Sequence, residues 1–397
     1  MTGSERPYLW LTRWPPYPPR QGGDMVYTRN VMENLALRAP VHGLAFGADA
    51  AAIPQRPGLT WSLVDEGEPP RWASLASPLP NVARRHVSRA YLAAAIQAAA
   101  GARAIFVDFI GMFWIVEPLL AALRARGGER APIVIIDHNF EHGVRRQMVE
   151  AEPKPHMKAL LAYDTWKAGR LERKANRIAD ALIPNTPLDE VLFQQVTDRP
   201  MRVVMPAYGG AKAGLREIGP DTPRRICILG NHDAHHKRMV LERTLAALSA
   251  KGIEKLCTVD VVGGGEKASF EARYPGFNFY GFVDDLETYL QGVRFGLIPD
   301  EIGGGFKIRA LTHAFQRVPM LAVRSALNGM GFTAGEHFAV AENLDELADQ
   351  VPALLEDYPR LNALQAAAFD HCLTAFDWAE RGRSLHDFVS NLPRPAQ

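Results

Sequence analysis

The sequence predicts an α/β protein built from two doubly wound domains. Short β-rich runs alternate with helical patterns along both halves of the chain, which is typical of parallel sheets with helices on both faces. The chain has 397 residues, more than one hydrophobic core usually holds, since domains commonly have about 100–200 residues. The segment 205–223 is rich in proline and glycine, as expected of a connection between domains. We therefore predict one domain over residues 1–207, a second over 208–375 and a final segment over 376–397.

The predicted strands are short apolar or β-branched runs bounded by turn residues. In the first half they cover residues 8–11, 41–46, 59–64, 104–107, 133–136 and 181–184. In the second half they cover residues 225–229, 258–262, 277–280, 295–298, 318–323 and 338–340. Because ligands bind doubly wound sheets outside the carboxyl ends of the strands, we expect functional residues in the loops that follow these strands.

Four such loops carry unusual residues. In the first half, Gly22 and Gly23 come after the first strand, and Asp-His-Asn-Phe-Glu occupies 137–141 after the fifth. In the second half, Asn-His-Asp-Ala-His-His-Lys-Arg occupies 231–238 after the first strand, and three glycines occupy 303–305 after the fourth. The loops of each half are expected to gather at one edge of its sheet, where the carboxyl ends of parallel strands meet.

The glycine run leads into a predicted helix start that carries two cations, Lys307 and Arg309. Glycine lets the backbone approach a ligand closely, and a helix N-terminus offers unpaired N–H groups and the positive end of its dipole to an anion. The segment is therefore a candidate diphosphate site. A plain strand-to-helix turn is the alternative interpretation.

Composition excludes several classes of protein. A hydrophobic fraction of 47% and a formal net charge of +1 describe an ordinary globular protein and not a nucleic-acid binder. Cys227, Cys257 and Cys372 are scattered outside any C-x-x-C spacing, so we expect neither a disulfide framework nor a zinc site, and a reducing cytoplasm. The first residues lack an apolar signal region, and no apolar run reaches about eighteen residues. We expect a protein that is neither exported nor membrane-spanning.

A series of motifs follows in a characteristic order. It consists of Gly-Gly after the first strand, His-Asn-Phe-Glu, Gly-Gly-Gly, Tyr-Gly-Phe, Gly-Gly-Gly-Phe-Lys-Ile-Arg-Ala-Leu and Phe-Asp-Trp, at residues 22–23, 138–141, 263–265, 280–282, 303–311 and 376–378. This series resembles the family 4 (group 1) retaining glycosyltransferases, which have the GT-B fold. The resemblance covers nearly the whole chain.

The resemblance implies two Rossmann-like domains that face each other across a cleft, with the C-terminal helix crossing back to the first domain. It implies an enzyme that moves a hexose from a nucleotide-sugar donor to a glycan or lipid-linked acceptor in bacterial surface polysaccharide or glycoconjugate synthesis. The implied catalytic residues are His138, Lys307 and Arg309, and the implied acceptor or sugar contacts are Asn139 and Glu141. The implied donor-binding residues are Gly22, Gly23, Asn231, Lys237, Gly303, Gly304, Gly305, Phe306 and Thr312.

No metal or other cofactor is expected. Transfer from a nucleotide sugar requires stabilisation of the departing diphosphate, which Lys307, Arg309 and the glycine amides can supply. The sequence has no Asp-x-Asp, and the pair at 284–285 is interpreted as a surface turn rather than a chelating site. The histidines at 232, 235 and 236 are interpreted as a solvated loop facing phosphate rather than a metal cluster.

One departure from the family pattern concerns the donor's ribose. The family commonly has a glutamate directly after the residue equivalent to Leu311, where this chain has Thr312 and His313. We expect Thr312, His313 or Glu301 to replace that contact. Two other functions stay open: a sugar-nucleotide epimerase, which uses the same architecture, and a non-catalytic GT-B binding subunit, which the missing glutamate favours.

Two further features have alternative interpretations. His138 either contacts the donor sugar or the acceptor, or packs under the next helix, and Glu141 either orients it or caps that helix. Arg84, Arg85 and Arg89 either form a solvated helix face or attract a membrane that bears a lipid-linked acceptor. The expected location is therefore the cytoplasm, with peripheral contact at the inner face of the membrane as one possibility.

Overall fold

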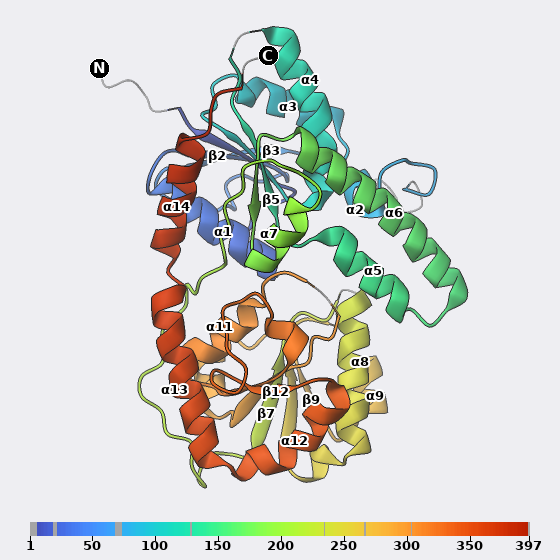
Figure 1. Cartoon of the computed structure of the whole chain (residues 1–397), viewed down its shortest axis with the longest axis vertical. Coiled ribbons are helices and arrows are strands. Elements are labelled where there is room, and N and C mark those ends of the chain that lie inside the picture. The colour runs from blue at the N-terminus through green and yellow to red at the C-terminus, as the bar shows by residue number, and fades with distance from the viewer. Residues whose placement is uncertain are drawn as a thin grey trace. The chain divides into compact units, whose positions relative to one another are not determined.

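The structure is a computed structural model that describes residues 6–18, 22–67, 74–127, 129–233, 235–265, 267–302 and 304–395. The chain forms two compact units (Figure 1). The first comprises Met1–Pro206, Gly304–Phe306 and Trp378–Gln397, and the second comprises Ala207–Gly303 and Lys307–Asp377. Gly303 lies outside the described residues, so its donor-binding role stays a prediction.

A six-stranded parallel sheet forms the centre of the first unit, with strand order β3-β2-β1-β4-β5-β6. Its strands are β1 (Tyr8–Leu11), β2 (Val41–Phe46), β3 (Leu59–Val64), β4 (Ile105–Asp108), β5 (Ile133–Asp137) and β6 (Ala181–Pro184). Its helices are α1 (Gly23–Ala36), α2 (Asn81–Arg84), α3 (Arg89–Ala99), the 3-10 helix η2 (Ile110–Ile115), α4 (Val116–Arg126), α5 (Glu141–Ala151), α6 (Pro155–Ile178), α7 (Pro187–Gln194) and α14 (Trp378–Ser390).

Continuous apolar runs explain why these strands form. β1, β4, β5 and β6 are buried at every position, whereas the edge strand β3 is largely exposed or half-buried. Burial on both faces is typical of parallel strands covered by helices. The order of the strands reverses between β1 and β4, and such a reversal is where doubly wound sheets bind ligands.

The second unit repeats this plan with strand order β12-β11-β10-β7-β8-β9. Its strands are β7 (Arg225–Leu229), β8 (Thr258–Val262), β9 (Asn278–Tyr280), β10 (Phe295–Ile298), β11 (Met320–Val323) and β12 (Ala339–Ala341). Its helices are α8 (His235–Ala250), η3 (Ile253–Lys255), α9 (Ala268–Arg273), α10 (Leu286–Gln291), α11 (Ile308–Phe315), η4 (Arg324–Leu327), α12 (Leu344–Glu356) and α13 (Tyr358–Ala375). Here the strand order reverses between β7 and β10.

The α/β class with two doubly wound sheets, predicted from the sequence, is confirmed. Every predicted strand is present, and all the pairings between these strands are parallel. The bounds differ most at β11, which begins at Met320 rather than at 318. Pro319 has no N–H to donate to a neighbouring strand, which favours the later start.

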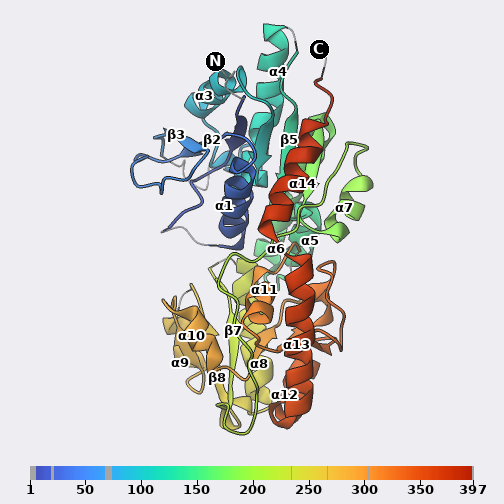
Figure 2. The ribbon, with the colours of Figure 1, turned by 90° about the vertical axis from the view of Figure 1, so that its left-hand side faces the viewer.

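The C-terminal helix α14 packs on α1 of the first unit (Figure 2). The two helices approach closely at Gly382, where an added Cβ would lie 2.7 Å from the Asn34 carbonyl oxygen. Tyr8 also reaches α14, because its hydroxyl lies 3.1 Å from His386 Nδ1. Within the described residues, no helix is both long and apolar enough to cross a membrane.

Candidate active site

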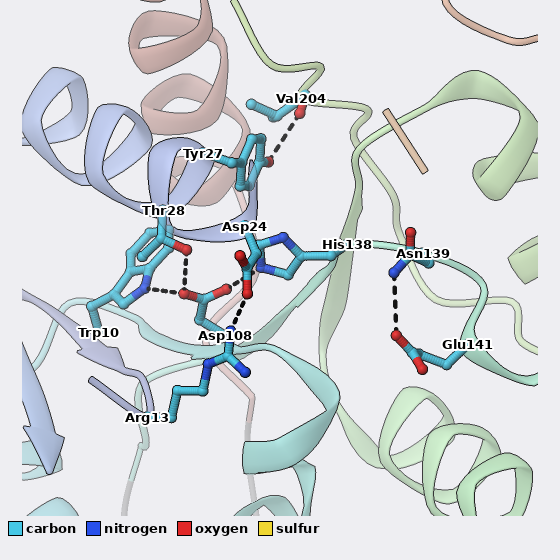
Figure 3. Close-up of polar contacts among 10 residues, drawn as sticks. All are labelled: Trp10, Arg13, Asp24, Tyr27, Thr28, Asp108, His138, Asn139, Glu141 and Val204. Carbon is cyan, nitrogen blue, oxygen red and sulfur yellow. Dashed lines mark hydrogen bonds and ion pairs between the residues drawn. The ribbon is translucent and has the colours of Figure 1, made fainter. Parts of the chain in front are cut away.

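Asp108, at the end of β4, is the centre of a buried polar cluster in the first unit (Figure 3). Its Oδ2 accepts hydrogen bonds from Trp10 Nε1 at 3.1 Å and from Thr28 Oγ1 at 2.7 Å. Its Oδ1 lies 2.6 Å from Nε2 of His138, which follows β5. Groups from β1, α1, β4 and the loop after β5 therefore meet beside the point where the strand order reverses.

Asp108 and His138 form a buried ion pair. Burial opposes ionisation of Asp108, but the charge of His138 and the hydrogen bonds from His138, Thr28 and Trp10 outweigh it and lower the pKa of Asp108. Burial also opposes protonation of His138, yet the charge and hydrogen bond of Asp108 raise the pKa of His138 above its usual value. His138 therefore donates its Nε2 proton to Asp108, and the second ring nitrogen is left for other partners.

Tyr27 and Arg13 define the rest of this cluster. The Tyr27 ring packs edge-on against the His138 ring with centroids 5.3 Å apart, and its hydroxyl donates to the Val204 carbonyl oxygen at 2.9 Å. Arg13, after β1, forms an ion pair with Asp24 in the first turn of α1. Its guanidinium also lies 4.0 Å from the centroid of the Phe109 ring. The cluster is thus held by packing and by hydrogen bonds on several sides.

The predicted donor-binding glycines Gly22 and Gly23 lie at the start of α1, next to this cluster. Gly22 precedes the helix and Gly23 is its first residue. An added Cβ on Gly22 would lie 2.6 Å from Asp24 Oδ1. The missing side chain therefore leaves room for the Asp24 carboxylate that pairs with Arg13.

Two carboxylates from α6 and α7 hold the loop that carries His138. Glu172 accepts hydrogen bonds from the backbone N–H groups of Glu141 at 2.7 Å and His142 at 3.1 Å. Asp189 accepts one from the Phe140 N–H at 3.1 Å. Glu172 therefore satisfies the first N–H groups of α5, which is the task that the cap interpretation gave to the Glu141 side chain.

The side chains of Asn139 and Glu141 face each other in this loop. Asn139 Nδ2 donates to Glu141 Oε1 at 3.2 Å (Figure 3). Arg145 Nε donates to Glu141 Oε2 at 3.0 Å. Asp108 rather than Glu141 bonds His138 among the described residues, so these contacts do not support the hypothesis that Glu141 orients His138. Burial and the neighbouring Glu141 raise the pKa of Glu172 to about 8.

In the second unit, Arg309 joins the ends of the two strands at the reversal point. Its Nη1 donates to the Leu229 carbonyl oxygen at the end of β7 at 2.8 Å. Its Nη2 forms an ion pair with Asp300, which follows β10. Burial opposes ionisation of Asp300, but the charges of Arg309, Lys307 and Lys237 outweigh it and lower the pKa of Asp300. Three of the cations expected at the donor site are therefore gathered around one carboxylate.

The loop after β7 is less solvated than predicted. Asn231 accepts a hydrogen bond from the Asp233 N–H at 2.8 Å and so closes a tight turn. The His232 side chain is buried, and the backbone N–H of His232 donates to the Gly264 carbonyl oxygen at 2.7 Å. Burial, with the charges of Arg309 and Lys237, lowers the pKa of His232 to about 4. The prediction of a solvated loop is wrong at His232, because the turn folds this residue against the end of β8.

Gly304, Gly305 and Phe306 connect the end of β10 to α11. Gly305 has a φ of +63°, in the left-handed region that favours glycine. Lys307 is the residue just before α11, and its N–H lies 3.4 Å from Met330 Sδ. Gly304 and Gly305 thus lie in the turn that was predicted for this segment, and the chain enters α11 with Lys307 just before the helix and Arg309 in its first turn.

The three residues proposed to replace the family's glutamate have different environments. Glu301 accepts a hydrogen bond from the Leu344 N–H at 3.2 Å and pairs with Arg243 at 2.7 Å. His313 is fully buried, and burial, with the charge of Arg309, lowers its pKa to about 3. Thr312 is half-buried on α11. Thr312 is therefore the best placed of the three to meet a ligand.

No metal cluster is found among the described residues: they contain no group of three or more His, Cys, Asp or Glu side chains that could hold a metal ion. Asp285 caps α10 by accepting a hydrogen bond from the Thr288 N–H at 2.9 Å. The interpretation of residues 284–285 as a turn is thus refined to a helix cap. Whether the reaction requires a metal stays a prediction.

Comparison with known proteins adds the family. Residues 223–357 match the protein family described as glycosyl transferases group 1. The chain carries a group 1 glycosyltransferase domain. That match assigns it to the transferases and covers β7 to α12 of the second unit, including Asp300, Lys307 and Arg309.

Solved structures similar to this glycosyltransferase share its fold over nearly the whole chain. Sucrose-phosphate synthase from Thermosynechococcus elongatus has a TM-score of 0.72 at 15% identity, covering 98% of this chain and 99% of its own. HepE from Anabaena, solved in complex with UDP and glucose, has a TM-score of 0.66 at 15% identity, covering 98% and 100%. WaaG, a glycosyltransferase involved in lipopolysaccharide biosynthesis, has a TM-score of 0.64 at 12% identity, covering 97% and 100%. The fold is therefore GT-B. Comparison with curated proteins finds no match.

Sequence reasoning missed the residues that support this glycosyltransferase's site from within the fold. Asp108 and Glu172 hold His138 and its loop, yet neither was predicted. Asp108 had a signal in the sequence, since it is a carboxylate directly after an apolar run, at the end of a predicted strand. Glu172 had none, because an acidic residue inside a helix usually faces solvent.

Proposed function

We propose that this glycosyltransferase transfers a hexose from a nucleotide-sugar donor to a glycan or lipid-linked acceptor in the synthesis of a bacterial surface polysaccharide or glycoconjugate. The observation that carries the proposal is the set of cations around Asp300 at the reversal point of the second sheet. Lys237, Lys307 and Arg309 bring positive charge to this place, which can stabilise a diphosphate as it departs. The N-terminus of α11 adds the positive end of its dipole.

The donor is proposed to be a UDP-sugar. HepE, which shares the fold, was solved with UDP and glucose and with UDP-glucose. The test is product analysis of the protein incubated with UDP-glucose and other UDP-hexoses, with and without candidate acceptors. Appearance of a glycosylated acceptor together with UDP supports the proposal, and intact UDP-hexose in every mixture contradicts it.

We propose that the transfer retains the anomeric configuration and needs no divalent cation. Support for retention is the motif series shared with the retaining family, and support for metal independence is the group of cations at the donor site. Activity is expected to be unchanged by excess EDTA. Loss of activity on chelation, with recovery on adding magnesium or manganese, would sink the metal-free proposal.

We propose that His138 contacts the donor sugar or the acceptor through the nitrogen that does not bond Asp108. The protonated ring lies at the carboxyl edge of its sheet, with Asn139 and Glu141 in the same loop. His138→Ala is expected to lower kcat/KM at least tenfold while the protein stays folded. A folded variant with full activity would show that His138 only packs under α5.

Two alternatives have a specific observation behind them. Thr312 and His313 replace the family's glutamate, and Glu301 is engaged with α12, which favours a non-catalytic binding subunit. A sugar-nucleotide epimerase is the other alternative, because it uses the same two-domain architecture. An epimerase would release an altered sugar nucleotide without any acceptor. A binding subunit would bind the nucleotide and give no product.

One exposed face of α6 supports the proposal that the acceptor is lipid-linked and lies in a membrane. Three large apolar side chains on the same side of this helix are exposed: Leu160 at 50%, Tyr163 at 46% and Trp166 at 50%. Arg170 follows them, and its guanidinium lies 4.9 Å from the centroid of the Trp166 ring. Residues 154–174 contain six lysines and arginines and two acidic residues. Exposed aromatic residues beside cations are typical of proteins that bind anionic membrane surfaces.

The helix that carries Arg84, one of the arginines predicted from the sequence, also contacts α6. The Asn81 N–H at the start of α2 donates to Asp164 of α6 at 2.8 Å, which brings the segment of Arg84 and Arg85 against α6. Replacing Tyr163 and Trp166 together with serine is expected to reduce sedimentation with phosphatidylglycerol vesicles at least threefold. The matched control is Leu37→Ser, another exposed apolar position in the first unit. Equal sedimentation of the double variant and the wild type would contradict the proposal.

A further inference from the structure

A pocket of about 290 Å³ opens at the amino ends of the strands of the first unit, away from the carboxyl edge that carries Asp108 and His138. Arg6 comes before β1, Arg103 before β4 and Pro132 before β5, and β1, β4 and β5 are neighbours in the sheet. The end of α14 and the segment after it close the pocket with Val389, Ser390, Leu392 and Arg394. The proposed transfer reaction uses none of these residues.

The charge of this pocket is one-sided. Of the described residues that line it, three are arginines and none is acidic. Arg394 also lies 3.7 Å from Glu129, which does not line the pocket, so its charge is partly offset, and its exposed side chain holds that pair only weakly. Three guanidinium groups around one small pocket create a positive potential that attracts anions.

Two of the lining groups are held in place before any ligand arrives. Arg103 Nη2 donates to Ser390 Oγ at 2.9 Å, and its guanidinium lies 5.5 Å from the centroid of the Tyr8 ring. Ser390 in turn donates to the His386 carbonyl oxygen at 2.6 Å. A guanidinium whose orientation is fixed loses less freedom when it binds a planar or tetrahedral anion.

We propose that this pocket binds a small phosphate-bearing ligand, either a soluble phosphate ester or the phosphate of a lipid headgroup. Arginine forks bind phosphate oxygens in pairs of hydrogen bonds, and the volume is at the lower end of known ligand sites, which suits one or two phosphate groups rather than a whole nucleotide sugar. Because α14 supplies one wall and the strands supply the other, the bound anion links the C-terminal helix to the sheet that it covers. Binding therefore stabilises the first unit.

The test is thermal unfolding of the full chain in inorganic phosphate or pyrophosphate, against sodium chloride of equal ionic strength. The wild type is expected to gain about 2–4 °C in Tm at saturating anion. Because the proposed donor site also binds diphosphate, the arginine variants are made in the Lys307→Ala background. The gain is expected to persist in Lys307→Ala and to disappear when Arg103→Gln and Arg394→Gln are added to it. Arg38→Gln, an exposed arginine elsewhere in the first unit, is the matched control and should keep the gain.

Arg6→Gln provides a milder variant in case the double variant folds poorly, because Arg6 is exposed; it should reduce the gain at least by half. Sedimentation with phosphatidylglycerol vesicles separates the two sources of phosphate. Arginine-dependent sedimentation assigns the site to a headgroup, and an arginine-dependent rise in Tm without sedimentation assigns it to a soluble phosphate. A Tm that does not respond to phosphate, or a rise that survives in both Arg6→Gln and the double variant, would overturn the proposal.

Discussion

At the scale of single residues, Asp108 determines how His138 is presented. A carboxylate buried at the end of a strand is costly unless its oxygens are satisfied, and here Trp10, Thr28 and His138 satisfy both of them. The same bonds fix the imidazole's orientation, so one buried residue supports both the fold and the candidate site.

Asp108→Asn removes the charge that pairs with His138 and leaves at least one buried hydrogen-bonding group without a partner. We expect a loss of about 1–3 kcal/mol in the free energy of unfolding, together with lower activity. Urea unfolding checks the stability. Asp198→Asn, an exposed position in the same unit, is the control and should be within about 0.5 kcal/mol of the wild type. An Asp108→Asn variant as stable as that control would refute the role of the pair.

The pair also predicts a pH dependence. The pKa of His138 is raised in the folded protein, so its contribution is complete below the ordinary value near 6.5 and is lost as the pH rises through the raised value. The pKa of Asp108 is lowered, so its contribution is complete above the ordinary value near 3.8 and is lost on acidification. The stability difference between the wild type and His138→Gln should therefore shrink as the pH rises from 6 to 9, measured by urea unfolding. A stability difference that is constant over this pH range would contradict the predicted pH dependence.

At the scale of elements, β10 and α11 approach each other through one glycine. An added Cβ on Gly296 would lie 2.3 Å from Cε1 of His313, so the imidazole of α11 packs directly on the strand. Both ring nitrogens of His313 lack a hydrogen-bond partner among the described residues. At this contact α11 is therefore positioned by shape, and Arg309 adds polar contacts to Leu229 and Asp300.

Gly296→Ala is expected to push α11 away from β10 and to destabilise the protein by about 1–3 kcal/mol, since overpacking a core has this cost. Gly214→Ala is the matched control in the second unit, because no atom lies within 4 Å of an added Cβ there. Chemical denaturation compares the two variants. The packing account fails if Gly296→Ala is no less stable than Gly214→Ala.

The sequence predicted the strands more accurately than it predicted single contacts. β1, β2, β3, β6, β7, β8 and β10 have the predicted bounds, because each is a compact apolar run between turn residues. The polar contacts were not predictable in the same way. Glu172 caps α5, and Asp300 pairs with Arg309, because of how separate segments pack together. A pattern within one segment carries no information about this packing.

At the scale of the whole molecule, two similar sheets carry different chemistry at equivalent places. Each sheet reverses its strand order once, and a carboxylate lies at each reversal. Asp108 ends β4 beside a histidine in the first unit, and Asp300 follows β10 beside an arginine in the second. Residues 223–357, which match the glycosyltransferase family, contain the cationic reversal point. The division of labour that we propose, with the donor diphosphate bound by the second unit, follows from this difference in charge.

The most direct test of this account is a thermal-shift titration of the full chain with UDP, in the wild type, in Lys307→Ala and in the control Lys255→Ala, which alters an exposed lysine at the opposite edge of the same sheet. Since a ligand that binds only the folded state raises its stability, we predict a rise in Tm for the wild type and for Lys255→Ala, and a rise reduced at least by half for Lys307→Ala. No rise in Tm with UDP or with any other nucleoside diphosphate, or an equal rise in all three proteins, would contradict the proposal that Lys307 helps to bind the donor diphosphate.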